Sequence, residues 1–436
     1  MSVMDMVVLM GIFFLAPILL SGEAFALNES LVKTFSHDPG GHIQAEGDWY
    51  HDKDNMLLFR EGNGDDTALS GYVRLFDRIR IGASLDGEIH YEAVAFGGEY
   101  YRHLARLAHD AAFPSIDPSF SVSDHTRLFN LTRVIDENAD YLVYHRLDRL
   151  FIRRAWMWGD LSLGRQAVTW GNGLMFNPMD LFNPFSPSDT NRDYKIGDDL
   201  VSLRITPPVV SEIQLLWVPR RDPDTGKVNE DRSSVGGKVH GFWGNLEVDA
   251  MAARHYEDAV LGGGVSGYLK KAAWRMDGVW VFSSANSYPD GYGELVINMD
   301  YSWVLLGKNM YGLAEYFFSG VGEEAPEKVL GCEPLMDRLA RGDLFVTGRH
   351  YAGGMIQVEW HPLVTLAVSL IHNLGDGSGI VQPRINWNAT QNSRVIVGLD
   401  TAYGGHGTEF GGFTVPGLGD AGGFPTRMFL QASFYF

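Results

Sequence analysis

The chain has 436 residues and a formal net charge of −19, with 35 Lys and Arg against 54 Asp and Glu. This acidic balance argues against nucleic-acid binding, because phosphate contacts need clustered cations on an exposed face. Cys332 is the only cysteine, which excludes an intramolecular disulfide, a cysteine-rich zinc site and a haem attached through Cys-x-x-Cys-His.

The first residues have the layout of a secretory signal peptide. Residues 6–20 form an apolar run interrupted only by Gly11 and Pro17, and Ala24-Phe25-Ala26 is a small-x-small cleavage site. The run departs from the usual pattern because Asp5, and no Lys or Arg, precedes it. We expect a signal peptide at residues 1–26 and a single mature domain at residues 27–436.

Apolar and polar residues alternate along many later segments, which predicts β-strands with one apolar and one polar face. Residues 297–303, Ile-Asn-Met-Asp-Tyr-Ser-Trp, are typical, and residues 201–206 and 364–370 follow the same pattern. A wall between lipid and water shows this alternation, but so does a soluble sandwich. The lengths of the connections between the strands distinguish a membrane barrel from a soluble sandwich.

Short and long connections follow one another in turn. Short ones lie near residues 85–87, 158–160, 244–245, 270–272 and 306–309, and the longest at 53–67, 101–140, 172–198, 322–349 and 405–424. Short periplasmic turns and long outer loops are typical of a transmembrane up-and-down barrel. We therefore predict an all-β antiparallel barrel of 18 strands, the first near residues 42–50, with 16 strands as the nearest alternative. A short helix is expected within residues 100–112.

The chain ends on a strand. Residues 427–436 read RMFLQASFYF, with apolar side chains two residues apart and a terminal Phe436. A strand at the end of a chain leaves its edge unpaired unless it closes a barrel. The segment resembles the closing strand of Gram-negative outer-membrane barrels, which implies an outer-membrane location, contact with lipid and recognition by the barrel-assembly machinery.

Several short motifs carry a family resemblance. They are Gly164-Arg165-Gln166, Trp170-Gly171, Asn177-Pro178-Met179-Asp180 and Asn183-Pro184. These resemble the GRQ, WG and NP-x-D elements of porin-like outer-membrane proteins that are distantly similar to alginate-export porins. The resemblance implies the type of barrel and leaves the solute open.

Arg165 does not fit the alternation of its strand. Leu161 and Leu163 are expected to face lipid, and Arg165 would then follow them. A bulge at Gly164 and Arg165 would return the guanidinium to the lumen; alternatively, Arg165 lies near the membrane interface.

The third outer loop, residues 172–198, is rich in Pro and Asx, which favours fixed turns. The third loop of general porins folds into the barrel and narrows the pore, so the resemblance implies a constriction here. Phe176, Leu181, Phe182 and Phe185 are its expected apolar anchors. The residues expected to form the constriction are Asn177, Pro178, Asp180, Asp189 and Asp193.

Charged residues on the polar faces of the strands would line the pore and select ions by sign. The candidates are Arg74, Arg78, Arg80, Gln166, Arg204, Glu359, Arg384, Arg394 and Asp400. The alternative is that the arginines pair with carboxylates on neighbouring strands and only stabilise the wall.

No catalytic motif of a hydrolase, metalloprotease or nucleotide-binding enzyme is present, so we expect neither an enzyme nor a cofactor. The leading prediction is a porin for passive passage of small hydrophilic solutes. One alternative is the sleeve of a porin–cytochrome electron conduit, with multihaem cytochromes as partners. The other is a closed structural or adhesive barrel that acts through residues 322–349 and 405–424.

Overall fold

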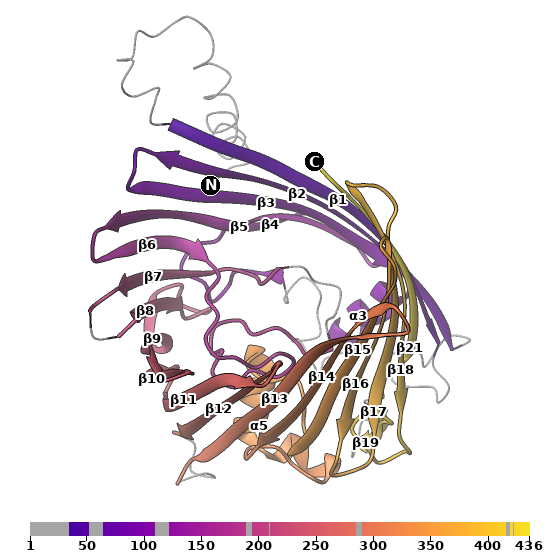
Figure 1. Ribbon diagram of the computed structural model, residues 1–436. Helices are drawn as coiled ribbons and strands as arrows, with labels where there is room; N and C mark the ends of the chain where they lie inside the picture. The colour runs from indigo at the N-terminus through magenta and orange to yellow at the C-terminus, as the bar shows by residue number, and fades with distance from the viewer. Residues whose placement is uncertain are drawn as a thin grey trace, which may run out of the picture.

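A computed structural model describes residues 35–51, 64–109, 122–188, 194–208, 210–284, 290–415, 419–421 and 423–436. The predicted signal peptide lies outside the described residues and stays a prediction. The described chain forms a closed antiparallel barrel of 18 strands (Figure 1). The prediction of 18 strands is confirmed, and the alternative of 16 is wrong.

The barrel strands follow one another in chain order. The first nine are β1 (Phe35–His51), β2 (Asp65–Ile81), β3 (Leu85–Gly98), β5 (Tyr141–Trp156), β6 (Gly159–Gln166), β7 (Asp198–Ile205), β8 (Glu212–Arg221), β9 (Val228–Trp243) and β10 (Leu246–His255). The other nine are β11 (Asp258–Leu269), β12 (Ala272–Phe282), β13 (Tyr292–Leu305), β14 (Lys308–Ser319), β15 (His350–His361), β16 (Val364–Asn373), β17 (Gly379–Asn388), β18 (Ser393–Tyr403) and β21 (Thr426–Tyr435). β19 (Phe413–Val415) and β20 (Gly419–Ala421) form a separate two-stranded sheet.

β21 closes the barrel, as the alternation at the end of the chain predicts. It pairs with β18 on one side and with β1 on the other, where Leu430 lies opposite Gly47. The ladder continues to the last residue, because Gly41 and Phe436 exchange two backbone hydrogen bonds of 2.9 Å. β1 extends on both sides of the residues 42–50 that its pattern predicts.

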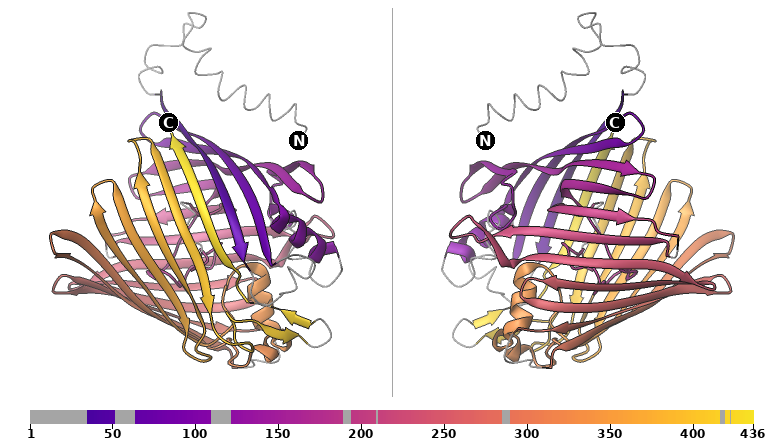
Figure 2. Two further views of the ribbon diagram at one scale, coloured as in Figure 1. Left: turned by 90° about the vertical axis from the view of Figure 1, so that its right-hand side faces the viewer. Right: turned by 90° about the vertical axis from the view of Figure 1, so that its left-hand side faces the viewer.

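The connections separate the barrel into two rims. Short connections such as 82–84, 244–245 and 306–307 lie on the rim that holds the C-terminus, which we call the turn rim (Figure 2), although the two-residue connection 256–257 lies on the opposite rim. The long connections lie on the opposite rim, the loop rim. They include α3 (Glu99–His109), which confirms the predicted helix, and η3 (Pro326–Gly331) and α5 (Glu333–Arg341). No helix within the described ranges is long and apolar enough to cross a membrane.

The two faces of the strands differ as the alternation predicts. On β12, Met276 and Trp280 are 40% and 45% exposed on the outer face, whereas Asp277 between them is fully buried on the inner face. A lipid-facing exterior and a polar interior are the arrangement expected of a transmembrane barrel.

A segment of the second loop fills a gap in the wall beyond the ends of β6 and β7, which have only eight residues each. β4 (Thr132–Glu137) pairs with β5 on one side of the gap. On the other side, the backbone N–H of Arg221 donates to the carbonyl of Thr126 at 2.7 Å. Residues 122–137 thus satisfy strand edges that would otherwise be open.

The predicted bulge at Gly164 and Arg165 is wrong. The pairing of β6 with β7 runs through both residues without a shift, although Gly164 adopts a positive φ of 124°. Arg165 is 1% exposed, and its guanidinium donates to Asp199 at 2.9 Å, to Asp124 at 2.9 Å and to the carbonyl of Phe129 at 2.8 Å. The gap-filling segment therefore covers this cation and supplies two of these three partners, and β7 supplies Asp199.

Arg427 ties the closing strand to both of its neighbours. It donates to Asp48 of β1 at 2.6 Å and to Asp400 of β18 at 3.3 Å. We expect Arg427→Ala to lower the free energy of unfolding by about 3 kcal/mol, because it leaves the covered carboxylate of Asp48 without its cation. Urea unfolding in lipid vesicles, followed by tryptophan fluorescence, measures this loss.

Arg78→Ala is the matched control. The Arg78 side chain is 56% exposed, and its ion pairs with Glu88 and Asp38 span 3.4 and 3.8 Å, so it contributes less than about 1 kcal/mol. Equal losses in the two variants would contradict the closing role of Arg427.

Candidate functional site: the barrel interior

The connection between β6 and β7 folds into the barrel, as predicted for the third outer loop (Figure 1). It runs over residues 167–197, of which 189–193 lie outside the described ranges. We call its described part the cross-lumen segment, because it hydrogen-bonds to strands on the far side of the ring. Two sets of contacts hold it, one near its own strands and one across the interior.

The near anchor is a buried ion pair. Lys195 Nζ donates to Asp180 at 2.6 and 2.7 Å and to the carbonyl of Val168 at 2.5 Å, which joins the two halves of the segment. Arg149 of β5 donates to the carbonyl of Lys195. Burial raises the pKa of Asp180 to about 6, against the opposing effect of Lys195. Burial also lowers the pKa of Lys195.

The far anchor is Glu315 of β14. Its carboxylate accepts the backbone N–H groups of Leu174, Met175 and Phe176 at 2.9, 3.1 and 2.6 Å. Asn298 of β13 also donates to Glu315 at 3.1 Å. Three consecutive N–H groups on one buried carboxylate fix the backbone of the segment against the wall, because each charge-assisted bond is strong and geometrically specific.

A second far contact lies on β12. Asp277 accepts the backbone N–H of Asn172, and it accepts the Asn172 side-chain amide at 3.0 Å. The amide also reaches Asp249 of β10 at 3.4 Å. Asn172 therefore joins the segment to two non-adjacent strands.

Apolar side chains of the segment pack on the inner wall. Phe176 stacks on Phe317 of β14 with centroids 4.6 Å apart, and Trp170 meets Phe182 edge to face at 5.4 Å. Of the four predicted anchors, Phe176, Leu181 and Phe182 are buried, whereas Phe185 is 41% exposed. The first three belong to one large apolar core with side chains of β7 to β17.

The connection between β14 and β15 completes this core. Leu335 of α5 is fully buried in it, and Arg338 of α5 pairs with Glu294 of β13 at 2.5 Å. Asp343 lies 3.3 Å from His255 of β10. Cys332 is also buried here, with Sγ 3.8 Å from the carbonyl of Val321. Two loops thus cover the inner side of one half of the barrel.

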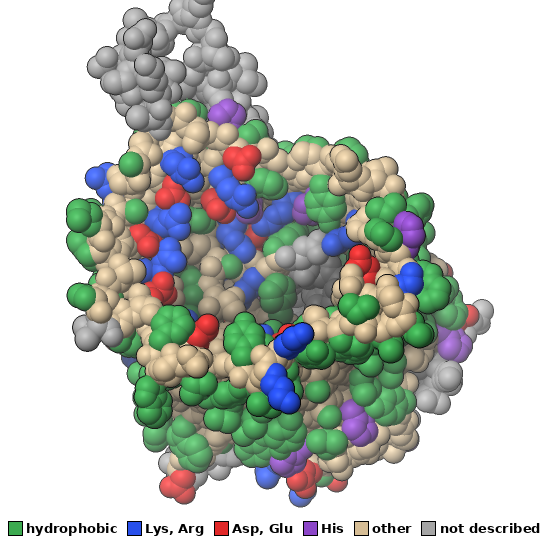
Figure 3. All heavy atoms as spheres, viewed as in Figure 1, with side chains coloured by type: hydrophobic (Ala, Val, Ile, Leu, Met, Phe, Trp, Pro, Cys, Tyr) green, Lys and Arg blue, Asp and Glu red, His purple; other side chains and the backbone are tan. Residues whose placement is uncertain are grey.

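The other half keeps a charged wall. Figure 3 looks into the barrel and shows Lys and Arg side chains beside Asp and Glu side chains around a hollow mouth. Arg74, Arg204 and Arg384 are each paired with a carboxylate, namely Asp148 at 2.8 Å, Asp160 at 3.1 Å and Asp400. The Arg74 guanidinium also lies 3.5 Å from the ring centroid of Tyr194 in the cross-lumen segment.

The remaining predicted lining residues are spread along the inner face. Arg78 and Arg80 are exposed near the turn rim. Gln166 is buried and accepts from Ser162 at 2.8 Å, Glu359 accepts from Asn309 at 2.6 Å, and the Arg394 guanidinium lies 5.8 Å from the Tyr435 ring. A role in ion selection stays a prediction for all of these residues.

The predicted constriction residues differ in their placement. Pro178 and Asp180 are buried, and the half-buried Asn177 donates to the carbonyl of Trp170 at 2.9 Å. Asp180 faces Lys195 and presents no free carboxylate to the lumen. Asp189 and Asp193 lie outside the described residues.

Comparison with solved structures places the barrel among known folds. OccAB4 of Acinetobacter baumannii has a TM-score of 0.53 at 9% identity, covering 93% of this chain and 99% of that one. OccAB1 of the same organism has a TM-score of 0.52 at 9% identity, and the match covers 91% of this chain and 96% of that one. A BenF-like porin from Pseudomonas fluorescens Pf-5 has a TM-score of 0.52 at 6% identity, and the match covers 92% of this chain and 98% of that one. The chain has the fold of an outer-membrane porin. No protein-family model and no curated protein matches it.

Reasoning from sequence missed Glu315, Glu294 and Lys195 as anchors of the loops inside this barrel. The sequence shows each of them only as a charged residue at an inward-facing or loop position. Many other residues share this feature, so it does not identify an anchor. Only the fold shows which of them meet a loop.

Glu315→Ala is expected to release the cross-lumen segment, because three backbone N–H groups lose their acceptor. Limited proteolysis of the detergent-solubilised barrel should then cut within residues 172–188 at least tenfold faster than in the wild type, an estimate from a loss of about 1.5 kcal/mol or more. Glu359→Ala, on the same face but away from the segment, serves as control. Equal cleavage rates for the two variants would contradict the role of Glu315 as the far anchor.

The buried Asp180 predicts a pH dependence. Its pKa is raised from 3.8 to about 6, so the folded barrel keeps a proton there that the unfolded chain releases at lower pH. The contribution of this group to stability therefore falls as pH rises from about 4 to about 6. Asp180→Asn should flatten the change in melting temperature across this window, measured by circular dichroism. An unchanged pH profile in the variant would contradict this prediction.

Proposed function

We propose that the protein is a channel for passive passage of small hydrophilic solutes across the outer membrane. The observation that carries the proposal is the asymmetric interior, in which a tethered segment narrows one half and a charged wall lines the other. Tethering by Glu315 and Asp277 holds the narrowing in place, and ion-paired charges favour polar over apolar solutes.

The wall carries both signs of charge, which favours a polar solute without a strong preference for ions. Arg204 faces Asp160 and Arg384 faces Asp400, so most of the local field is compensated. Arg78 and Arg80 near the turn rim are exposed. Arg78 meets Glu88 and Asp38 only at 3.4 and 3.8 Å, so a passing solute would meet its charge less compensated than those of Arg204 and Arg384.

A closed barrel that acts through its outer loops is the second candidate. The apolar core that the loops form inside the ring favours it, because such a core excludes water. The sleeve of an electron conduit has less support, because a cytochrome in the lumen would displace the cross-lumen segment and expose its buried side chains.

Conductance in planar bilayers tests the channel. We expect discrete single-channel steps from the purified, folded barrel, and Arg78→Ala should shift the anion-to-cation permeability ratio about twofold toward cations at low salt, where exposed charges are least screened. Lys271→Ala, at an exposed turn between β11 and β12, should leave the ratio unchanged. A folded barrel that gives no steps would reject the channel in favour of the closed barrel.

A further inference from the structure

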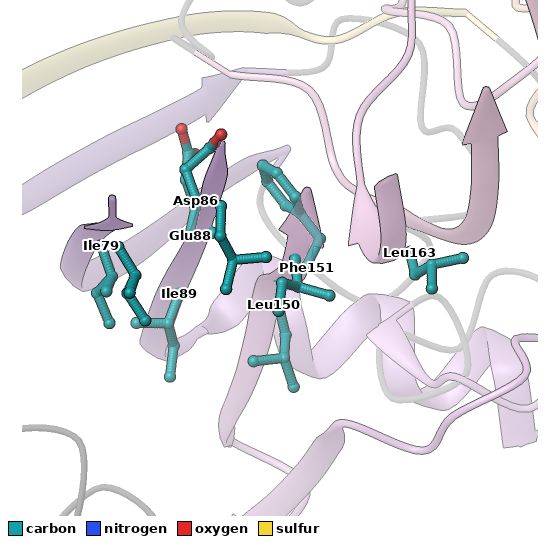
Figure 4. Close-up of a pocket in the computed structure, with 11 residues that line it drawn as sticks. Ile79, Asp86, Glu88, Ile89, Leu150, Phe151 and Leu163 are labelled. Carbon is teal, nitrogen blue, oxygen red and sulfur yellow. The ribbon is translucent and has the colours of Figure 1, made fainter. Parts of the chain in front are cut away.

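The outer face of the barrel carries an apolar groove over β2, β3, β5 and β6. Its volume is about 360 Å³, and its side chains include Ile79, Ile81, Ile89, Leu150, Ile152 and Leu163. Figure 4 shows Ile79, Ile89 and Leu150 on one side of the sheet, with the carboxylate of Asp86 directed to the opposite side. The groove is thus formed by the lipid-facing surface and is separate from the lumen.

Gly87 explains why the sheet is hollowed here. It lies opposite Ile79 of β2 and Ile152 of β5 on the outer face. A Cβ at this position would lie 2.6 Å from the carbonyl oxygen of Phe151, which is closer than non-bonded contact allows. The floor of the groove is therefore backbone between rows of branched side chains.

A cation stands at the turn-rim end of the groove. Arg154 lies opposite Leu85 and follows Ile152 by two residues, so both point outward. It is exposed, and no ion pair is formed by it in the part of the chain that the structure describes. Its neighbour Arg153 points inward and pairs with Asp86 at 2.9 Å. The two arginines thus serve opposite faces of one strand.

The depth of Arg154 in the membrane follows from its neighbours. Trp156 and Trp158, the next outward residues toward the turn, are exposed and stacked with centroids 5.5 Å apart. Exposed tryptophans on the outer face mark the level of the lipid head groups. Arg154 therefore lies within reach of the head groups, and the groove extends from it toward the acyl chains.

We propose that this groove binds an anionic phospholipid, with one acyl chain along Gly87 and the phosphate on Arg154. Guanidinium binds phosphate through paired N–H donors. Short turns lie on the periplasmic side of such barrels, where the outer membrane carries glycerophospholipid. The nearby Asp77 is buried, lies 3.6 Å from His37 and accepts the backbone N–H of Asp38 at 3.1 Å. This site is independent of what the lumen conducts.

Native mass spectrometry of the detergent-solubilised full chain tests the site with added phosphatidylglycerol, phosphatidylcholine or lipid A. We expect one tightly held phosphatidylglycerol per barrel, in preference to the other two. Arg154→Ala should weaken that binding about fivefold, the effect of one basic side chain near the membrane surface, and remove the preference for the anionic head group. Arg153→Ala, one residue away on the inner face, should change neither the strength of phosphatidylglycerol binding nor the preference for the anionic head group.

A second variant tests the groove itself. Ile152→Trp places a larger side chain on an already exposed outer position, and it should weaken both phospholipids alike by blocking the acyl chain. Equal binding of phosphatidylglycerol by wild type and Arg154→Ala would overturn the site. A preference for lipid A would overturn the choice of phospholipid.

Discussion

The interaction on which the rest of the structure depends is the backbone ladder between β1 and β21. In hydrocarbon every unpaired N–H or C=O costs several kcal/mol, so a sheet crosses a membrane only when its edges meet. Here they meet over ten residue pairs from His42 to His51, and the ladder ends with Phe436 bonded to Gly41. Closure divides every strand into a lipid face and an inner face, and the placement of all charges follows from that division.

The inner face carries many buried charged side chains, and the loops supply partners for some of them. A charge in a covered interior is stable only when it is paired or hydrogen-bonded. Some pairs form within the wall, as in Arg384 with Asp400. Other inner-face carboxylates bind groups of the loops. Glu315 accepts three backbone N–H groups of the cross-lumen segment, and Glu294 forms an ion pair with Arg338 of α5. The same need for partners that stabilises the wall therefore narrows the lumen.

Local sequence patterns predicted the parts of this porin fold that depend on local physics. Alternation over residues 427–436 predicted the closing strand, and the order of turns and loops predicted the number of strands. The Pro and Asx residues of the third loop predicted fixed turns, and the resemblance to porins implied that this loop folds inward. Arg165 shows the limit, because alternation alone suggested a bulge, whereas the structure covers the guanidinium with Asp124 from a loop 41 residues away in sequence. No periodicity encodes such a partner.

The sequence by itself thus determined the strands and their two faces, because lipid on one side and water on the other impose a period of two on each strand. It also determined their even number, because short turns and long loops alternate along the chain. The tertiary structure alone decided which charges meet. Asp180 could stand free in the pore or face a cation, and only the folded loop brings Lys195 within 2.6 Å of it. Likewise, only the curvature and register of four strands set Gly87 and Arg154 on one outer groove. Pairings between distant residues depend on how the chain closes, and this is a property of the whole barrel.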